Sequence, residues 1–425
     1  MDMIRTRIIP CRLSRATCDA LNAASGSIYT GVMVWHWRTY RRQGHWLSER
    51  AASRWADRRG TAALHAHSVD AAQQGFYRAC AVARASRKAG LPDVRFPYHR
   101  RKFRTTIWKN TGIRRKGDAL ILSNGRGTAS IAIPLPEGLR DALRFVEVRL
   151  VYDKAGRRYD WHIVVEDGKA QKPAPGSNVV SADLGEVHPA VVGDAHEATI
   201  ITCRRRRAES QGHARRLANI DRALARKRKG SKRHRRLIQA KVRMKAKYAR
   251  VLRDMEHKIS RAIVDAAVER KAGTIVIGDV RDAADGVDLG KAANQKISRW
   301  NHGKVRQYVT YKAEAEGIAV KLEDEAYTSQ TCPSCQGRHK PKGRRYRCPA
   351  CGFQAHRDVV GQVNILSAFQ YGEPGKIPAP AVVKYRIPHN VRVMRRCQGT
   401  GQVEASPPVA RRWVQLGLFR EAAGL

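Results

Sequence analysis

Acidic residues and long apolar runs are scarce in this sequence. Its 425 residues include 82 Lys and Arg but only 37 Asp and Glu, so the formal net charge is +45. A compact fold with this excess repels itself unless a polyanion neutralises it, and nucleic acid is therefore the expected partner. No run of about 18 apolar residues is present, and the first residues lack the apolar stretch of a secretory signal. We expect no membrane association.

A regular disulfide pattern is also missing. Five of the nine cysteines have no repeated spacing. The other four form two Cys-x-x-Cys pairs with twelve residues between them, a spacing that lets four thiolates surround zinc tetrahedrally. Because four protein ligands leave the ion no open position, the predicted role of this zinc is structural; two disulfides or a redox pair are the alternatives. The scattered cysteines are Cys11, Cys18, Cys80, Cys203 and Cys397, and the predicted zinc ligands are Cys332, Cys335, Cys348 and Cys351.

The hydrophobic periodicity of the first part of the chain changes from helical to β-type. Residues 13–89 have few prolines and apolar residues at helical spacing, whereas 102–166 contain short β-rich runs separated by Gly, Asp or Pro. A Pro- and Gly-containing segment at 171–177 predicts a linker. The expected elements are a strand at 3–11, helices between 13 and 89, and strands at 119–122, 129–133, 146–151 and 161–165.

Strands and helices alternate after the linker. The helix expected between the strands at 274–277 and 318–322 has the length of a right-handed crossover, so these two strands should be parallel. The tail beyond about residue 371 is rich in Pro, Arg and Gly, has little periodicity, and is predicted to be mobile. The expected elements are strands at 179–184, near 190 and near 199, a basic helical region at 208–271, a strand at 274–277, a helix at 300–316 and a strand at 318–322.

Two aspartates lie where a carboxylate could bind a catalytic metal ion. One follows an apolar strand, and the other follows the predicted zinc ligands. Asp183 ends an apolar strand and is followed by Leu-Gly, while Asp358 stands at the start of a helix just after the cysteines. Carboxylates are the ligands that magnesium prefers, and a pair of divalent ions about 4 Å apart can cut a phosphodiester. A turn role for Asp183 and a helix N-cap role for Asp358 are the competing interpretations.

The order of these parts resembles the TnpB family of transposon-encoded RNA-guided DNA nucleases, relatives of the type V CRISPR effectors. The matching motifs lie between residues 179 and 366: Asp-Leu-Gly, Ile-Val-Ile-Gly-Asp-Val, Tyr-Thr-Ser-Gln-Thr-Cys, and Arg-Asp-x-x-Gly-x-x-Asn-Ile-Leu. The first 175 residues match only in layout. The resemblance implies an α+β multi-domain fold: a β-barrel wedge domain at 1–12 and 102–175, a helical recognition domain at 13–101, a RuvC/RNase H-like α/β nuclease at 176–330, a zinc ribbon at 331–355, a last nuclease helix at 356–370 and a basic tail at 371–425.

The resemblance also implies an activity and partners. The expected function is metal-dependent cleavage of double-stranded DNA, guided by an RNA made from the transposon end, after the N-terminal domains recognise a short target-adjacent motif. Two Mg²⁺ ions, or Mn²⁺ in their place, would serve catalysis beside a structural Zn²⁺. We expect a monomer in the cytoplasm of a bacterium or archaeon, associated with the nucleoid. A repressor that binds DNA through its guide without cutting is the main alternative, and a DNA transposase is a less favoured one.

The sequence departs from the family at one catalytic position. Most members carry a glutamate where this chain has Gly278. Asp279 is a weak substitute, since a one-residue shift along a strand turns the side chain to the opposite face. Glu323 and Glu325, on the next strand, share a face, and Glu325 lies farther toward the rim where α/β sheets build their sites. A solvated acidic turn is the alternative here. We predict Asp183, Glu325 and Asp358 as catalytic metal ligands, with Glu323 or Asp279 as alternatives.

Basic residues gather in the long helical region. A guide RNA paired with target DNA is recognised through its backbone, which requires many Lys and Arg side chains. A solvated helix face is the alternative. The predicted nucleic-acid-binding residues are Arg204, Arg205, Arg206, Arg207, Arg226, Lys227, Arg228, Lys229, Lys232, Arg233, Arg235 and Arg236.

Overall fold

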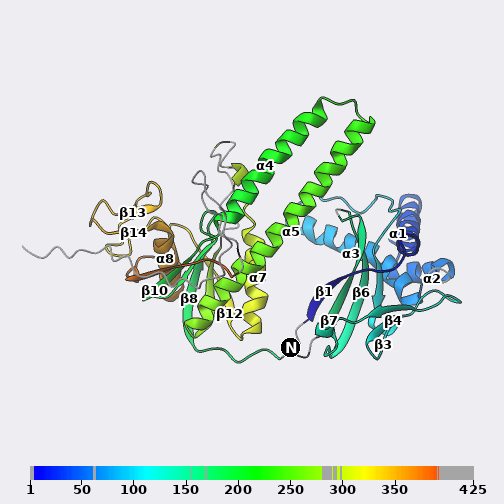
Figure 1. Cartoon of the computed structure of the whole chain (residues 1–425), viewed down its shortest axis with the longest axis horizontal. Coiled ribbons are helices and arrows are strands. Elements are labelled where there is room, and N and C mark those ends of the chain that lie inside the picture. The colour runs from blue at the N-terminus through cyan, green and yellow to red at the C-terminus, as the bar shows by residue number, and fades with distance from the viewer. Residues whose placement is uncertain are drawn as a thin grey trace, which may run out of the picture. The chain divides into compact units, whose positions relative to one another are not determined.

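The chain folds into two compact units, Met1–Ala170 and Gln171–Leu425 (Figure 1). The computed structural model describes residues 4–60, 64–154, 156–166, 168, 170–279, 290, 294–296, 299–389 and 391. The linker predicted at 171–177 begins at the boundary between the units. Within the described ranges, no helix combines the length and the apolar character needed to cross a membrane.

The first unit consists of three helices and two antiparallel sheets. One sheet has the strand order β1-β7-β6-β2 and the other β3-β4-β5, so the first strand of the chain pairs with a strand that follows the helices. The elements are β1 (Ile4–Pro10), α1 (Arg15–Gln43), α2 (Glu49–Gly60), α3 (Ala66–Lys88), β2 (Thr106–Lys109), η1 (Asn110–Gly112), β3 (Ile113–Lys116), β4 (Ala119–Leu122), β5 (Ile131–Pro134), η2 (Glu137–Leu139), β6 (Arg144–Asp153) and β7 (Arg158–Glu166).

The two sheets and the helices of this unit share one hydrophobic core. Alternation along β4 buries Leu120 and Leu122, which pack with apolar residues of the helices and of the larger sheet. Helix α1 begins after Ser14, whose hydroxyl accepts a hydrogen bond from the amide of Thr17, and ends at Gly44 with a φ of 66°. The described strands are hydrogen-bonded as two separate sheets rather than as the one closed barrel that the family layout predicted.

The second unit is built on a six-stranded mixed sheet with the order β12-β11-β8-β9-β10-β15. β11 pairs in parallel with both β8 and β12, which confirms the predicted parallel crossover. β9 runs antiparallel to β8 and β10. The elements are β8 (Asn178–Asp183), β9 (Ala190–Gly193), β10 (Glu197–Ile201), α4 (Arg204–Ala225), α5 (Lys232–Glu269), β11 (Ala272–Asp279), α7 (His302–Ala315), β12 (Ala319–Asp324), β13 (Arg345–Arg347), β14 (Gln354–His356), α8 (Arg357–Tyr371) and β15 (Val382–Arg386).

Helices cover both faces of this sheet. α5 and α7 pack together on one face, and α8 packs on the other against β8, β9, β11 and β12. Strands covered on both sides are expected to be apolar along their length, as the fully buried Ala-Val-Val-Gly of β9 is. α8 is tied to the central strand because the Ser181 hydroxyl donates to the Gln362 carbonyl at 2.7 Å and accepts from the Gln362 amide at 2.8 Å.

Part of the tail belongs to the sheet, so the prediction of a mobile segment from residue 371 was wrong there. β15 pairs in parallel with β10 at the edge of the sheet. Ion pairs of Lys384 with Glu197 and of Arg386 with Glu269 reinforce this edge strand. Three of its five residues are Val or Tyr, but the run is short and lies among Pro, Arg and Gly, so apolar spacing did not single it out. Residues 392–425, the rest of the predicted tail, lie outside the described residues.

Candidate functional site

Three carboxylates from distant parts of the sequence meet beside one rim of the sheet. Asp183 is the last residue of β8, Glu325 follows the end of β12, and Asp358 lies in the first turn of α8. Burial, then the negative charges of Glu325 and Asp358, raises the pKa of Asp183 well above its usual value, and the Arg357 cation opposes this only in part. The three acids predicted from the sequence are therefore electrostatic neighbours.

Glu325 occupies the space that a side chain at position 278 would need. A Cβ atom added to Gly278 would lie 2.7 Å from Oε2 of Glu325 and 2.8 Å from Cδ1 of Ile365. Glu323 is the residue paired with Gly278 on the neighbouring parallel strand. The carboxylate next to the glycine, however, is that of Glu325, two residues farther along the chain. Burial, followed by the charges of Asp279 and Asp324, raises the pKa of Glu325 to about 7.

Helix α8 positions two of the acids through small and polar residues. A Cβ atom on Gly361 would lie 2.6 Å from Oδ2 of Asp183, so this glycine lets the helix approach the carboxylate. The Asn364 amide donates to the carbonyls of Thr328 at 2.7 Å and Thr331 at 2.8 Å. The Thr328 hydroxyl in turn donates to the Glu325 carbonyl at 2.9 Å. The helix that carries Asp358 thus also anchors the loop that carries Glu325.

The two alternative acids have other surroundings. Asp279 forms an ion pair with Arg306 of α7, with 3.3 Å between the carboxylate and guanidinium atoms. Glu323 lies half-buried at the end of β12. Since the charges that raise the pKa of Asp183 are those of Glu325 and Asp358, the geometry favours Glu325 over either alternative.

Asp358 is not the N-cap of α8, so that competing interpretation was wrong. The cap is His356, whose Nδ1 accepts a hydrogen bond from the amide of Asp358 at 3.2 Å. The Asp358 carboxylate accepts instead from the guanidinium of Arg344 at 2.8 Å. It is therefore held by a side chain of the cysteine segment rather than by the backbone of its own helix terminus.

Two histidines that sequence reasoning missed lie beside Asp358. His188 follows Asp183 by five residues, and His356 precedes Asp358 by two. Their rings lie 5.3 Å apart between centroids, and one potential ligand atom from each histidine and from Asp358 lies within 4.8 Å of the others. Burial lowers the pKa of both histidines, which keeps the rings neutral near neutral pH. The sequence carried a signal in the His-Arg-Asp spacing, but His188 has no local motif.

The four clustered cysteines fit a zinc ion. The Sγ atoms of Cys332 and Cys351 lie 3.7 Å apart, and those of Cys335 and Cys348 lie 3.6 Å apart. Four thiolates about 2.3 Å from a tetrahedral zinc would have sulfur atoms roughly 3.8 Å from one another. All four cysteines are free thiols, so the arrangement matches a metal site better than disulfides.

The zinc-binding segment is joined to the acidic site. The amide of Arg357, the first residue of α8, donates to the carbonyl of Arg344 at 2.8 Å. Arg344 lies between the two cysteine pairs and also contacts Asp358. Folding of the cysteine segment therefore fixes the start of the helix that presents Asp358.

Helices α4 and α5 form a long hairpin (Figure 1). The basic residues predicted to bind nucleic acid lie at the start of α4, in the turn between the two helices and at the start of α5. Arg205 and Arg207 form ion pairs with Glu209 and Glu186. Arg206 is buried, with 5% of its surface exposed, so it does not form part of an open basic surface as expected. The predicted residues that are exposed are Arg204, Arg226, Lys227, Arg228, Lys229, Lys232, Arg233, Arg235 and Arg236.

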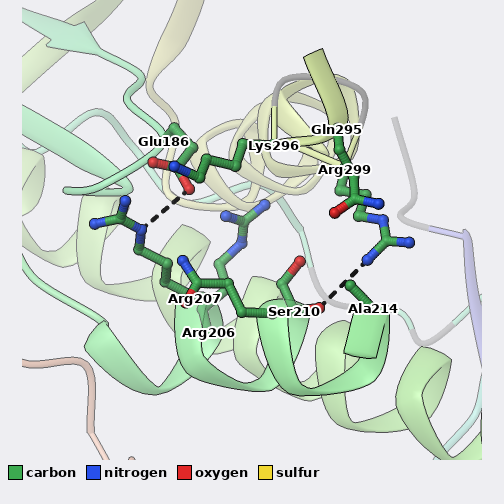
Figure 2. Close-up of a pocket in the computed structure, with 9 residues that line it drawn as sticks. Glu186, Arg206, Arg207, Ser210, Ala214, Gln295, Lys296 and Arg299 are labelled. Atoms are coloured by element: carbon green, nitrogen blue, oxygen red, sulfur yellow. Dashed lines mark hydrogen bonds and ion pairs between the residues drawn. The ribbon is translucent and has the colours of Figure 1, made fainter. Parts of the chain in front are cut away.

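A small basic pocket of about 20 Å³ lies at the start of α4 (Figure 2). Its cations are Arg206, Arg207, Lys296 and Arg299, against the single carboxylate of Glu186. The Arg207 guanidinium lies 3.4 Å from Glu186, which leaves the pocket with a net positive charge.

Family models and curated relatives match the second unit and the end of the first. A model described as a probable transposase matches residues 162–284, and a model of the Cas12f1-like TNB domain matches residues 302–365. A TnpB-like protein of Methanocaldococcus jannaschii is 29% identical over 28% of this chain and 44% of its own. The CRISPR-associated endodeoxyribonuclease Cas12f1 of Sulfoacidibacillus thermotolerans is 33% identical over 26% of this chain and 25% of its own.

A third relative, InsQ of Escherichia coli K12, is 27% identical over 49% of this chain and 54% of its own. The chain thus spans between a quarter and about half of the length of these relatives. The fold is similar to that of Cas12f1 in its complex with guide RNA and target DNA, with a TM-score of 0.60, 12% identity and 83% of each chain covered. It is also similar to the mini-RNA-guided endonuclease CRISPR-Cas_phi3, with a TM-score of 0.55, 10% identity and 89% and 94% of the two chains covered. Together the matched family models and the TnpB-like and InsQ relatives support a TnpB-type protein related to Cas12f.

Proposed function

We propose that this protein is an RNA-guided, metal-dependent endonuclease that cuts double-stranded DNA. The observation that carries the proposal is the position of Glu325, whose carboxylate fills the space above Gly278 beside Asp183 and Asp358. A glutamate lost from one strand is thus replaced in space by a glutamate from the neighbouring one. The second unit is then a RuvC/RNase H-like nuclease with a relocated glutamate.

The donor set suits magnesium. Asp183, Glu325 and Asp358 offer only carboxylate oxygens, which are the ligands that Mg²⁺ prefers, and burial together with the charges of Glu325 and Asp358 raises the pKa of Asp183. Bound in pairs, such ions activate water and stabilise the leaving oxygen of a phosphodiester. The protein's own contribution is to hold the three carboxylates on packed elements, with α8 anchoring two of them.

Further proposals concern the partners. We propose a guide RNA from the transposon end and a matched DNA target as the polyanions that neutralise the charge of +45. Support comes from the exposed cations of the α4–α5 hairpin and from the names of the relatives and neighbours, which include an endodeoxyribonuclease and complexes with guide RNA and target DNA. The first unit would recognise the target-adjacent motif as a wedge domain with an inserted helical domain, and the protein would act as a monomer.

A repressor that binds DNA without cutting remains the second candidate, because Gly278 removes the usual glutamate. The position of Glu325 argues against it, since a protein that only binds has no need to bring three acids together. The transposase alternative is supported by the description of one matching family model alone.

Replacing Glu325 with Gln tests the proposal. The full chain, purified with its guide RNA, should lose magnesium-dependent cleavage of a matched target by orders of magnitude and keep its affinity for that target. Asp183→Asn and Asp358→Asn should have the same effect. The measurements are single-turnover cleavage and filter binding on the same preparations.

Glu323→Gln is the matched control, since it removes the same group two residues away and should cut nearly normally. If Glu323→Gln abolishes cleavage and Glu325→Gln does not, the glutamate assignment is wrong. If the unmodified protein binds its target but never cuts it in Mg²⁺ or Mn²⁺, the nuclease proposal is wrong and the repressor takes its place.

A further inference from the structure

The cluster of His188, His356 and Asp358 has a donor set unlike that of the other acids. One potential ligand atom from each of the three residues lies within 4.8 Å of the others. The three residues come from the loop after β8 and from the start of α8, two segments that the packing of α8 on the sheet brings together. Two imidazoles and one carboxylate therefore face a common point at one side of the proposed nuclease site.

His188 carries an unexplained buried nitrogen. Its Nδ1 atom is inaccessible to solvent and has no hydrogen-bond partner among the described residues. A buried polar atom left without a partner costs free energy, and such an atom in a native fold calls for a specific explanation. The aromatic neighbours of this ring are His356, at 5.3 Å between centroids, and Tyr385, at 6.5 Å, and the charged groups that act on it are Asp358, Arg344 and Arg204.

We propose that His188, His356 and Asp358 bind a divalent first-row transition ion, for which Mn²⁺ serves as the paramagnetic probe. Imidazole nitrogen is a good ligand for such ions and a poor one for Mg²⁺, whereas a mixed nitrogen and oxygen set with open positions suits both binding and exchange of water. Asp358 is then shared between this ion and the all-oxygen site of Asp183 and Glu325. The use of the ion in DNA cleavage rests on the proposed function, but its binding does not.

The surroundings of Asp358 allow an ion to enter. Its present partner is Arg344, whose side chain is 44% exposed and can turn toward solvent. The side chains of His356 and Asp358 are 21% and 22% exposed. Their ligand atoms therefore lie near the surface but are only partly accessible to solvent. A metal ion would replace the guanidinium as the positive charge next to Asp358.

Mn²⁺ binding to the full chain without nucleic acid tests the proposal. The cysteine site is first shown to hold one zinc by metal analysis, because Mn²⁺ does not compete well with zinc for thiolates. Electron paramagnetic resonance then measures the affinity for Mn²⁺, and the spin-echo modulation from ¹⁴N reports whether imidazole nitrogen is bound. We expect ¹⁴N modulation in the unmodified protein, weakened in His188→Asn and in His356→Asn and absent from the double variant, with affinity at least tenfold lower in each.

Asn is chosen at position 356 because it caps helices well, so α8 should keep its start when the ring is removed. His196→Asn, at an exposed histidine of the same unit, is the matched control and should change neither signal. Bound Mn²⁺ without ¹⁴N modulation, or modulation that survives in the double variant, overturns the proposal. Neither result affects the nuclease, whose failure would appear as absent cleavage in a protein that still shows the nitrogen signal.

Discussion

At the scale of a single residue, the absence of a side chain at position 278 makes room for Glu325. Glycine is the one residue that leaves room for the Glu325 carboxylate, because even a methyl group would approach Oε2 to 2.7 Å. The sequence alone could predict that Glu325 or Glu323 replaces the lost glutamate, since both follow a parallel neighbouring strand. It could not predict that the Glu325 carboxylate fills the space above Gly278, because this requires the positions of both backbones.

Gly278→Ala should therefore impair cleavage although no acid is changed. We expect a fall of one to two orders of magnitude in the single-turnover rate with unchanged target affinity, since Glu325 must move and Ile365 blocks the other side of the added methyl group. Gly303→Ala in α7 is the control, because an added Cβ meets no atom within 4 Å there. Equal rates for the Gly278 variant and the unmodified protein would show that Glu325 does not act from this position.

His36 gives the first unit a pH-dependent stability. The ring is 0% exposed, lies 4.4 Å from Trp46 and 5.0 Å from Phe76 between centroids, and neither nitrogen has a hydrogen-bond partner among the described residues. Burial, then the charge of Arg84, lowers its pKa from 6.5 to about 4. Above pH 6.5 the residue is neutral in both states. As the pH falls toward 4, the unfolded chain takes up a proton that the folded chain excludes, so stability decreases.

His36→Phe should remove this pH dependence while keeping the aromatic packing. We expect the unmodified protein to lose roughly 2 to 3 kcal/mol between pH 7 and pH 4, at about 1.4 kcal/mol per pKa unit, and the variant to lose clearly less. Urea unfolding followed by tryptophan fluorescence measures this. His45→Gln, at an exposed histidine of the same unit, should behave as the unmodified protein. A parallel loss in the His36 variant would assign the acid sensitivity to other groups.

At the scale of elements, the sequence predicted helices and strands correctly where their apolar residues recur at a regular spacing. The alternating helices and strands of the second unit and the parallel pair β11 and β12 followed from apolar spacing and crossover length. β15 did not, because it is a five-residue edge strand in a stretch rich in Pro and Arg, and ion pairs of Lys384 and Arg386 help to hold it. The cap of α8 was also missed, since His is a rare N-cap and Asp358 two residues later is a more typical one.

The zinc-binding segment should be needed for the start of α8. Cys335→Ser should lower the zinc content of the protein and unfold residues 331–355, because such segments fold around their metal. The backbone hydrogen bond from Arg357 to Arg344 is then lost, which displaces Asp358 and reduces cleavage. Metal analysis, limited proteolysis and cleavage are the measurements. Cys11→Ser, outside the cluster, is the control; zinc loss with normal protease resistance and cleavage would contradict the structural role.

At the scale of the whole molecule, the composition predicted a polyanionic partner but not the surface that meets it. Arg206 is buried, and Arg205 and Arg207 form ion pairs. A run of basic residues in the sequence does not by itself make a binding surface. The turn between α4 and α5 differs. Arg226, Lys227, Arg228 and Lys229 are all exposed there, and their side chains have no ion-pair partner in the part of the chain that the structure describes.

Changing these four residues to Ala should weaken nucleic-acid binding in a salt-dependent way. Each lost phosphate contact removes about 0.9 from the slope of log affinity against log salt for duplex DNA and about 0.7 for single strands, so the loss of four contacts should lower the slope by roughly 3 to 4. The control carries the same change in charge at four arginines that already have acidic partners, Arg140, Arg144, Arg149 and Arg158. Their removal should alter the slope far less, because paired cations release few counterions. An unchanged slope in the first variant, or an equal fall in both, would mean that the tip of the hairpin does not contact the phosphate backbone.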